Sequence, residues 1–236
     1  DNIRSIKPDI IINCSALTDV DFCEKNSDQA FKVNSLIPSN INKVIRKYKF
    51  GTRVIQISTD QIYRSGLKSD IGDENPINVY SQSKLMGDNE IERLKNFCII
   101  RTNFLFREQI DWLKKKCASN KGFTLFQDVF CNPIEINIAA QIILKIANMN
   151  INGVYNLGST NSLSKADIFI QIAEKLNLDY SKAIFTSIDK VNLIAKRPKD
   201  MTMKVDSLQK EFNIKLPSLS ESINNLVNSY IKQFQI

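Results

Sequence analysis

The sequence predicts an α/β protein with a parallel sheet that is covered by helices on both faces. Short runs of β-branched residues, each bounded by turn residues, recur through the first 157 residues. Helical patterns, with apolar residues three and four positions apart, lie between these runs. Because strands that alternate with helices pair in parallel through crossover connections, this order predicts a doubly wound fold.

Four runs are expected to form the sheet, at residues 9–14, 53–58, 97–101 and 153–157. Helices are expected at residues 28–48, with a break near Pro38, and at 80–94 and 135–148. In open α/β sheets, ligands bind at the carboxyl ends of the strands. The site is therefore expected in the segments 15–24, 59–63, 102–107 and 127–135.

The pattern changes after residue 157. Ser164 and Asp167 form an N-cap signature for a helix that ends near Leu176, and further helices are expected at residues 206–212 and 220–234. We therefore expect a large domain at residues 1–157 and a smaller, mostly helical lobe at residues 158–236.

Composition excludes several kinds of chemistry. The 236 residues include no histidine, which excludes Ser-His and Cys-His nucleophile pairs and histidine zinc sites. Proton transfer near neutral pH must then fall to Tyr, Lys, Asp or Glu. The five cysteines are odd in number and stand among apolar neighbours, which is typical of reduced thiols rather than a disulfide framework.

The net charge of +7 does not predict a nucleic-acid partner, because the lysines are spread along the chain. The one tight run, at residues 114–116, has only Trp112 as a nearby aromatic residue. Solvated lysines and an attraction for small polyanions such as nucleotides both stay open as interpretations. No apolar run approaches the ~18 residues that cross a bilayer, and residues 1–8 are too polar for a signal peptide. We therefore expect no membrane partner and a cytoplasmic location.

Tyr80 and Lys84 stand in the segment Y-S-Q-S-K, where a helix places them one turn apart on the same face. A lysine ammonium beside a phenol favours the phenolate and lowers a tyrosine pKa from ~10 toward the working range of an acid or base. The spacing alone is weak, because such a pair more often belongs to an exposed helix face. Thr59 and Asp60 strengthen it, since they directly follow the apolar strand at 53–58.

Further motifs accompany this set almost from end to end of the chain. They are K-P-D-I-I-I-N-C-S-A at 7–16, T-D-V-D-F-C-E at 18–24, V-N-S at 33–35, I-S-T-D-Q-I-Y at 57–63, E-N-P-I-N-V-Y-S-Q-S-K-L-M-G-D at 74–88, R-T-N-F at 101–104, a proline turn around Pro133, R-P at 197–198 and F-N-I-K-L-P at 212–217. In order and spacing, the chain resembles the extended short-chain dehydrogenase/reductase superfamily, and within it the dTDP-4-dehydrorhamnose reductase family of sugar-nucleotide reductases.

The resemblance implies a Rossmann fold. Residues 1–157 would form the dinucleotide-binding domain, in which residues 104–134 contribute to the substrate site, and residues 158–236 the substrate-binding lobe. The implied activity is an oxidoreductase that uses NADPH or NADH to reduce the C4 keto group of a nucleotide-linked 4-keto-6-deoxyhexose. Its product would enter rhamnose and surface polysaccharide biosynthesis. The oligomeric state stays open, with a homodimer as one candidate.

The resemblance also implies three catalytic residues. Tyr80 would protonate the keto oxygen, Lys84 would tune Tyr80 and hold the nicotinamide ribose, and Thr59 would hydrogen-bond the same oxygen as charge develops on it. The cofactor would also be bordered by Ala16, Leu17 and Thr18.

Thr59, Asp60, Phe104 and Val20 would contact the substrate. Other interpretations of these positions stay open. Phe104 could equally be a core residue, and Asp60 or Thr18 could serve in a turn or a helix cap.

Gln61 separates this chain from one related activity. Sugar-nucleotide 4,6-dehydratases resemble this strand end but carry a glutamate where this chain has Gln61, which cannot transfer a proton near neutral pH. A 4-epimerase stays open because it would use the same Tyr and Lys. So does a non-catalytic subunit of the same fold, such as the one that associates with methionine adenosyltransferase.

The chain departs from the resemblance at its glycines. None of its seven glycines forms a G-x-G turn, which a dinucleotide-binding fold uses to bring backbone close to the pyrophosphate. We therefore expect an N-terminally truncated fold that lacks about 50 residues, a strand-helix-strand unit and a little more. Cofactor affinity is expected to be poor, and the choice between NADH and NADPH stays open. Cys131, Ile134 and Arg107 also differ from the family pattern.

Overall fold

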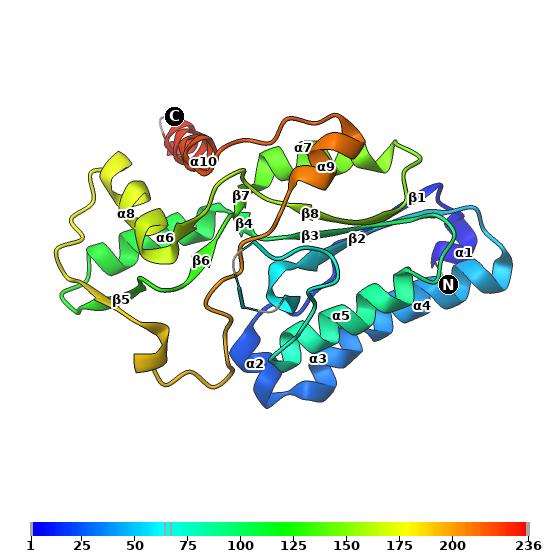
Figure 1. Cartoon of the computed structure of the whole chain (residues 1–236), viewed down its shortest axis with the longest axis horizontal. Coiled ribbons are helices and arrows are strands. Elements are labelled where there is room, and N and C mark those ends of the chain that lie inside the picture. Colours follow the sequence, from blue (N-terminus) through cyan, green and yellow to red (C-terminus); the bar gives the residue numbers. More distant parts are fainter. Residues whose placement is uncertain (1, 64, 67, 235–236) are drawn as a thin grey trace.

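The computed structural model, which describes residues 2–63, 65–66 and 68–234, has the predicted α/β architecture (Figure 1). In this part of the chain the central sheet is parallel throughout, with strand order β1-β2-β3-β8. These strands are β1 (Ile10–Asn13), β2 (Arg53–Thr59), β3 (Phe97–Thr102) and β8 (Gly153–Leu157). All four predicted strands are confirmed.

Helices cover both faces of the sheet, as Figure 1 shows. One face carries α3 (Ser27–Asn34), α4 (Leu36–Tyr48) and α5 (Val79–Ile91), and the other carries α7 (Ile136–Ala147) and α9 (Asp206–Phe212). Successive strand residues point to opposite faces, so Val54 packs with α4 and α5 while Ile55 packs with α7. Both faces are therefore apolar, and the strands lack the polar alternation of a solvated sheet.

The break in the first long helical segment is at Ser35, not near Pro38 as predicted. Pro38 is the third residue of α4, where a backbone N–H has no partner within the helix. A proline is tolerated there, so it marks the beginning of α4 rather than its interruption. The remaining predicted helices, including α7 and α9, are confirmed.

A second group of elements lies beside the sheet. It comprises α6 (Arg107–Cys117), α8 (Lys165–Lys175), α10 (Leu219–Phe234), the parallel pair β5 (Phe123–Phe126) and β10 (Ala183–Thr186), the parallel pair β4 (Phe104–Leu105) and β7 (Ile134–Glu135), and the antiparallel pair β6 (Phe130–Cys131) and β9 (Leu163–Ser164). Ser164 caps α8 as predicted, because its hydroxyl accepts from the Asp167 N–H at 3.1 Å. The sequence patterns did not predict α6 or these short strand pairs.

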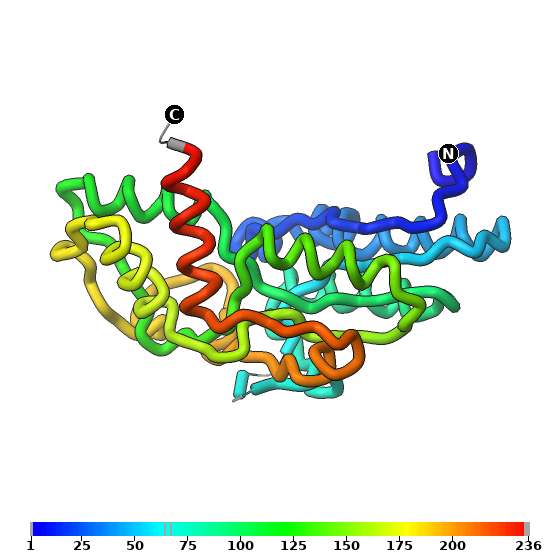
Figure 2. The backbone as a smooth tube through the Cα atoms, turned by 90° about the horizontal axis from the view of Figure 1, so that it is seen from above, coloured from blue at the N-terminus to red at the C-terminus, as the bar shows by residue number. Residues whose placement is uncertain are grey.

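The two groups have separate apolar cores, although the chain passes between them more than once. Leu105, Leu113 and Ile172 belong to the core of the second group, whereas α9 packs against β8 of the sheet. The division into domains at residues 157 and 158 stays a prediction. The molecule is elongated, with α6 and α8 at one end and α1 (Asn2–Ile6) at the other (Figure 2).

The remaining short elements are α2 (Val20–Lys25) and the 3-10 turns η1 (Asp60–Ile62) and η2 (Ile188–Lys190). Across the residues that the structure describes, every helix is too short or too polar to span a bilayer.

Candidate active site

The sheet brings Thr59 and Tyr80 to the same edge. Thr59 is the last residue of β2, and Tyr80 is the second residue of α5. Asn78 caps this helix, because its side chain accepts from the Ser81 N–H at 2.8 Å while the Ser81 hydroxyl accepts from the Asn78 N–H at 3.3 Å. The cap fixes where the helix begins, and it thereby places Tyr80 in the first turn, beside the end of β2.

Tyr80 is buried, with 6% of its surface exposed. Burial raises the pKa of its phenol above the usual range, and hydrogen bonding with the Thr59 side chain offsets only part of that increase. The negative charges of Asp60 and Asp88 act in the same direction as burial. The expectation of a lowered tyrosine pKa is therefore wrong for this conformation. The phenol stays protonated, which is the form of a general acid.

Lys84 lies one turn further along α5 and is even less exposed, at 2%. Its Nζ donates to the Ile57 carbonyl of β2 at 2.7 Å. Burial lowers the pKa of this ammonium, while the charge of Asp88 opposes the change. The structure thus places the predicted lysine against the strand that ends in Thr59.

Asp60 is a buried carboxyl next to this pair. Its Oδ2 accepts from the Asn103 side-chain amide at 2.7 Å, and its Oδ1 accepts from the Thr59 hydroxyl at 3.2 Å. Burial raises the pKa of Asp60 to about 6, against the opposing effects of Asn103, the nearby Lys165 charge and Thr59. Asp60 is therefore poised to change charge just below neutral pH.

The loop after β1 carries the residues expected to border a cofactor. Ala16 and Thr18 are exposed, and Leu17 is half-buried. Leu17 is clamped through its backbone by Asn34, whose side chain accepts from the Leu17 N–H at 2.8 Å and donates to the Leu17 carbonyl at 3.1 Å. The same amide donates to the Ser83 hydroxyl of α5 at 3.0 Å. Asn34 therefore fixes this loop relative to the helix of Tyr80 and Lys84.

Val20 is buried and belongs to the same apolar cluster as Tyr80 and Leu17. Phe104 is half-buried in β4 and packs against the core between the sheet and α7. The structure thus brings Val20, but not the Phe104 ring, into the cluster around Tyr80.

The segment around Ala195 closes the other side of this cluster. Ala195 is buried with Tyr80, and its N–H donates to Asp21 of α2 at 3.0 Å. Arg197, for which the sequence indicated no role, forms an ion pair with Asp21 at 3.0 Å. Asn78 also donates to the Lys196 carbonyl at 2.9 Å. These contacts hold residues 195–197 against α2 and the N-cap of α5, next to Tyr80.

Several residues of the site were present in the motifs but had no predicted role. Asn34 stands in V-N-S, Asp88 closes the long motif at 74–88, and Arg101 and Asn103 stand in R-T-N-F. These residues are polar but stand within otherwise apolar strands and helices. A buried polar group needs a hydrogen-bond partner, so this pattern could have indicated that they contact other site residues.

A small cavity of about 180 Å³ borders Asn103 and Gln61. Lys165 and Gln109 add polar groups to its wall, and the rest is largely apolar, including Leu105 and Met201. Asn103, which lines this cavity, donates to Asp60, so the cavity lies beside the buried carboxyl at the end of β2.

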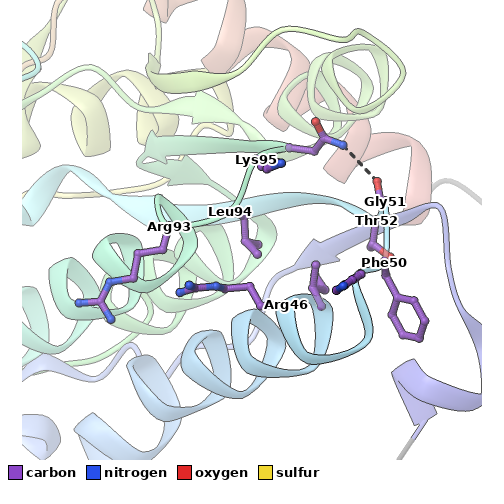
Figure 3. A pocket seen from close by; sticks show the side chains of 10 residues that line it. Arg46, Phe50, Gly51, Thr52, Arg93, Leu94 and Lys95 are labelled. Atoms are coloured by element: carbon purple, nitrogen blue, oxygen red, sulfur yellow. Dashed lines mark hydrogen bonds between the residues drawn. The ribbon is translucent and has the colours of Figure 1, made fainter.

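A cavity of about 620 Å³ lies elsewhere, near the far ends of α4 and α5 (Figure 3). Arg46, Phe50, Arg93 and Leu94 line it. The length of α5, 13 residues or about 20 Å, separates this cavity from Tyr80. It is therefore not part of the candidate active site.

The residues present fit the nicotinamide end of a dinucleotide cofactor. The Lys84 ammonium has three N–H donors, of which the Ile57 carbonyl takes one, so two can serve ribose hydroxyls. The exposed Ala16 and Thr18 lie beyond β1 on the loop that Asn34 holds near α5. The 236 residues contain no glycine-rich turn for the pyrophosphate end.

Comparisons with known proteins match nearly the whole chain. The family model described as RmlD substrate binding domain matches residues 1–232. A relative named "Probable low-salt glycan biosynthesis reductase Agl14", from Haloferax volcanii, is 24% identical over 91% of this chain and 75% of its own length. A dTDP-4-dehydrorhamnose reductase from Sinorhizobium fredii is 26% identical over 96% of this chain and 82% of its own.

Solved structures share the fold. The crystal structure of dTDP-4-dehydrorhamnose reductase from Bacillus anthracis, in complex with NADP, matches with a TM-score of 0.87 at 23% identity, over 97% of this chain and 83% of that chain. The Rossmann-like fold class is confirmed, as is the resemblance seen in the motifs. Since the family model spans nearly every residue that forms the sheet, the helices and the strand-end site, the chain belongs to the family of the RmlD substrate binding domain.

Proposed function

We propose that this protein reduces the C4 keto group of a nucleotide-linked 4-keto-6-deoxyhexose, with NADPH or NADH as the reductant. The observation that carries the proposal is the convergence of Thr59, Tyr80 and Lys84 at the carboxyl end of β2. The names of the relatives support the same substrate class. We further propose a cytoplasmic enzyme whose product supplies deoxysugar for surface polysaccharide.

The bound nicotinamide would supply the hydride to C4. Tyr80 would give its proton to the keto oxygen, because burial keeps the phenol protonated in the protein without ligand. Thr59 would hydrogen-bond the same oxygen as negative charge develops on it. The Lys84 ammonium would stabilise the phenolate that Tyr80 becomes, since an adjacent positive charge favours the ionised phenol.

Asp60 and Val20 are proposed to contact the sugar nucleotide beside Tyr80. Val20 shares the apolar cluster of the tyrosine, and Asp60 shares the Thr59 hydroxyl with it. The small cavity beside Asn103 offers polar groups to hydroxyls of the sugar ring. Phe104 has less support as a substrate residue, because its ring packs in the core beside α7.

The test is oxidation of NADPH or NADH in the presence of dTDP-4-dehydrorhamnose, followed by absorbance. Tyr80→Phe removes only the phenolic oxygen, so we expect kcat to fall by at least ~100-fold, as for loss of a general acid. Tyr180→Phe is the matched control, because the Tyr180 hydroxyl donates to Glu174 in the second group of elements.

Undiminished turnover in Tyr80→Phe would overturn the catalytic assignment. Binding of the sugar nucleotide without any oxidation of cofactor in the parent protein would instead favour the non-catalytic subunit. Interconversion of C4 epimers without net oxidation of cofactor would favour the epimerase.

A further inference from the structure

Asp88 is a fully buried carboxyl in α5, one turn beyond Lys84. Its Oδ2 accepts from the Ser58 hydroxyl of β2 at 2.6 Å. Its Oδ1 has no hydrogen-bond partner among the described residues. Burying a carboxylate with one oxygen unpaired lowers the stability of the folded protein. The presence of Asp88 at this position therefore needs a reason other than stability.

Arg101 of β3 and Lys84 both act on this charge. The Nη1 of Arg101 already has the carboxylate of Glu74 and the Tyr63 hydroxyl, the latter at 3.0 Å. Its Nε lies 3.7 Å from Asp88 Oδ2 without a hydrogen bond. Glu74 is the closer partner of Arg101, and the charge of Lys84 lowers the pKa of Asp88 more than that of Arg101 does.

Lys84 needs the support of the Asp88 charge because it is buried with one hydrogen bond, to the Ile57 carbonyl. Burial lowers the pKa of the ammonium, and Asp88 is the largest opposing influence, followed by Cys14. The charged groups that face Asp88 are Lys84 on its own helix, Glu92 at the C-cap of that helix and Arg101 on β3. The carboxylate thus acts on the lysine across one helical turn.

The Ser58 contact has a second consequence. Ser58 lies between Ile57, which accepts from Lys84, and Thr59, which interacts with Tyr80. A hydrogen bond from Ser58 to Asp88 therefore holds the end of β2 against α5, on which Tyr80 and Lys84 lie. One carboxyl joins the two elements that supply the proton-transfer set.

We propose that Asp88 is a positioning residue for this set: it keeps Lys84 protonated and fixes the Thr59 end of β2 relative to Tyr80 and Lys84. The inference rests on the proposed function for its catalytic consequence, although its effect on Lys84 is independent of any substrate. Without the Asp88 charge, Lys84 loses its proton at lower pH, and the phenolate of Tyr80 loses its stabilising neighbour.

The primary test measures the pKa of Lys84 by NMR detection of its side-chain amine, with the signal assigned by comparison with Lys84→Met. Asp88→Asn keeps the size and an acceptor for Ser58 but removes the charge. We expect the pKa of Lys84 to fall by about one unit, a tenfold loss of proton affinity. Asp88→Glu should restore most of it. Glu90→Gln is the control, because Glu90 pairs with Arg93 near the exposed end of α5.

A second readout is the pH profile of kcat. In Asp88→Asn the alkaline limb should move to lower pH by about the same unit, with the KM for the sugar nucleotide changed by less than about twofold. A purely structural role would lower stability and leave both the profile and the Lys84 pKa in place, which would overturn the proposal. If the parent protein reduces no keto sugar, the proposed function fails while the NMR result still decides the role of Asp88.

The parent protein itself offers a further test. Burial raises the pKa of Asp88 to about 6, so its carboxyl can be titrated while the fold is intact. The Lys84 signals should shift as Asp88 takes up its proton near that pH. Lys84 signals that stay constant through the titration of Asp88 would contradict the coupling.

Discussion

Asp60 and Tyr80 both interact with the Thr59 hydroxyl, and burial raises the pKa of both. Tyr80 therefore stays protonated across the physiological range, whereas Asp60, with a pKa of about 6, changes charge within it. The single hydroxyl of Thr59 lies between a proton donor and a titratable carboxyl. The protonation of this site is thus set by exclusion of water rather than by the motif alone.

The raised pKa of Asp60 has a measurable effect on stability. Between the ordinary value of 3.8 and about 6, the folded protein retains a proton at Asp60 that the unfolded chain releases. The stabilising contribution of this proton is fully present below 3.8 and is lost as the pH rises through about 6. In urea unfolding, the free energy of the parent protein relative to Asp60→Asn should rise by on the order of 1 kcal/mol from pH 7 to pH 4.5.

Glu108→Gln is the control for this comparison, since it removes an exposed carboxyl of α6 rather than a buried one. Parallel stability curves for the parent protein and Asp60→Asn between pH 4.5 and 7 would contradict the raised pKa.

At the level of elements, the site depends on how closely α5 approaches α3. Gly87 allows this approach, because a Cβ atom at that position would lie 2.2 Å from the Asn34 backbone oxygen and 3.1 Å from Pro38 Cγ. The Asn34 side chain in turn holds the Leu17 loop and Ser83. Close packing of the two helices therefore sets the distance between the proposed cofactor loop and the helix of Tyr80.

Gly87→Ala tests this packing. A glycine in an exposed helix gains up to about 1 kcal/mol of stability on replacement by alanine. Here the added methyl group meets backbone, so we expect a net loss of roughly 1–3 kcal/mol in the free energy of unfolding, measured by urea denaturation. Gly51→Ala is the control, because a Cβ atom at that position would have no neighbour within 4 Å. A Gly87→Ala protein as stable as the parent would show that the helices can separate at no cost.

Across the whole molecule, the chain connects the sheet to the second group of elements. α9 packs against β8 of the sheet, and α10, which follows it, contacts α8, β4 and β7. The buried Asn132 side chain donates to the carbonyls of Ser159 at 2.9 Å and Met203 at 3.0 Å. Because α10 contacts both α8 of the second group and β7, which packs beside the sheet, these contacts couple the two groups.

We therefore expect one cooperative unfolding transition. The single tryptophan, Trp112 of α6, reports on the second core, where its ring lies 5.1 Å from that of Phe169. The far-ultraviolet circular dichroism reports on all helices. The urea midpoints from the two signals should coincide, as for a two-state unit. Two distinct midpoints would show that the sheet and the second group of elements unfold independently.

Local patterns were sufficient to predict the four strands, the main helices and the α8 cap. The roles of Thr59, Tyr80 and Lys84 rest on the motifs and the resemblance, and they stay predictions. Strand and helix periodicity is a property of neighbouring residues, so it can be read directly from the sequence. α6 escaped prediction because most of its residues are charged or polar and only Ile110 and Leu113 are buried. The helix break at Ser35 escaped because proline is compatible with a first turn.

The chemistry of the predicted residues depends on the folded chain. The pairs Ser58 and Asp88, Asn34 and Leu17, and Asp21 and Arg197 meet through the crossing of strands and helices, which periodicity does not encode. The direction of the Tyr80 pKa shift likewise follows from burial, which depends on everything packed around the phenol. The amino-acid sequence thus predicted which residues could transfer a proton. Their protonation states emerged only from the three-dimensional arrangement, because desolvation and distant charges act on them only once the chain is folded.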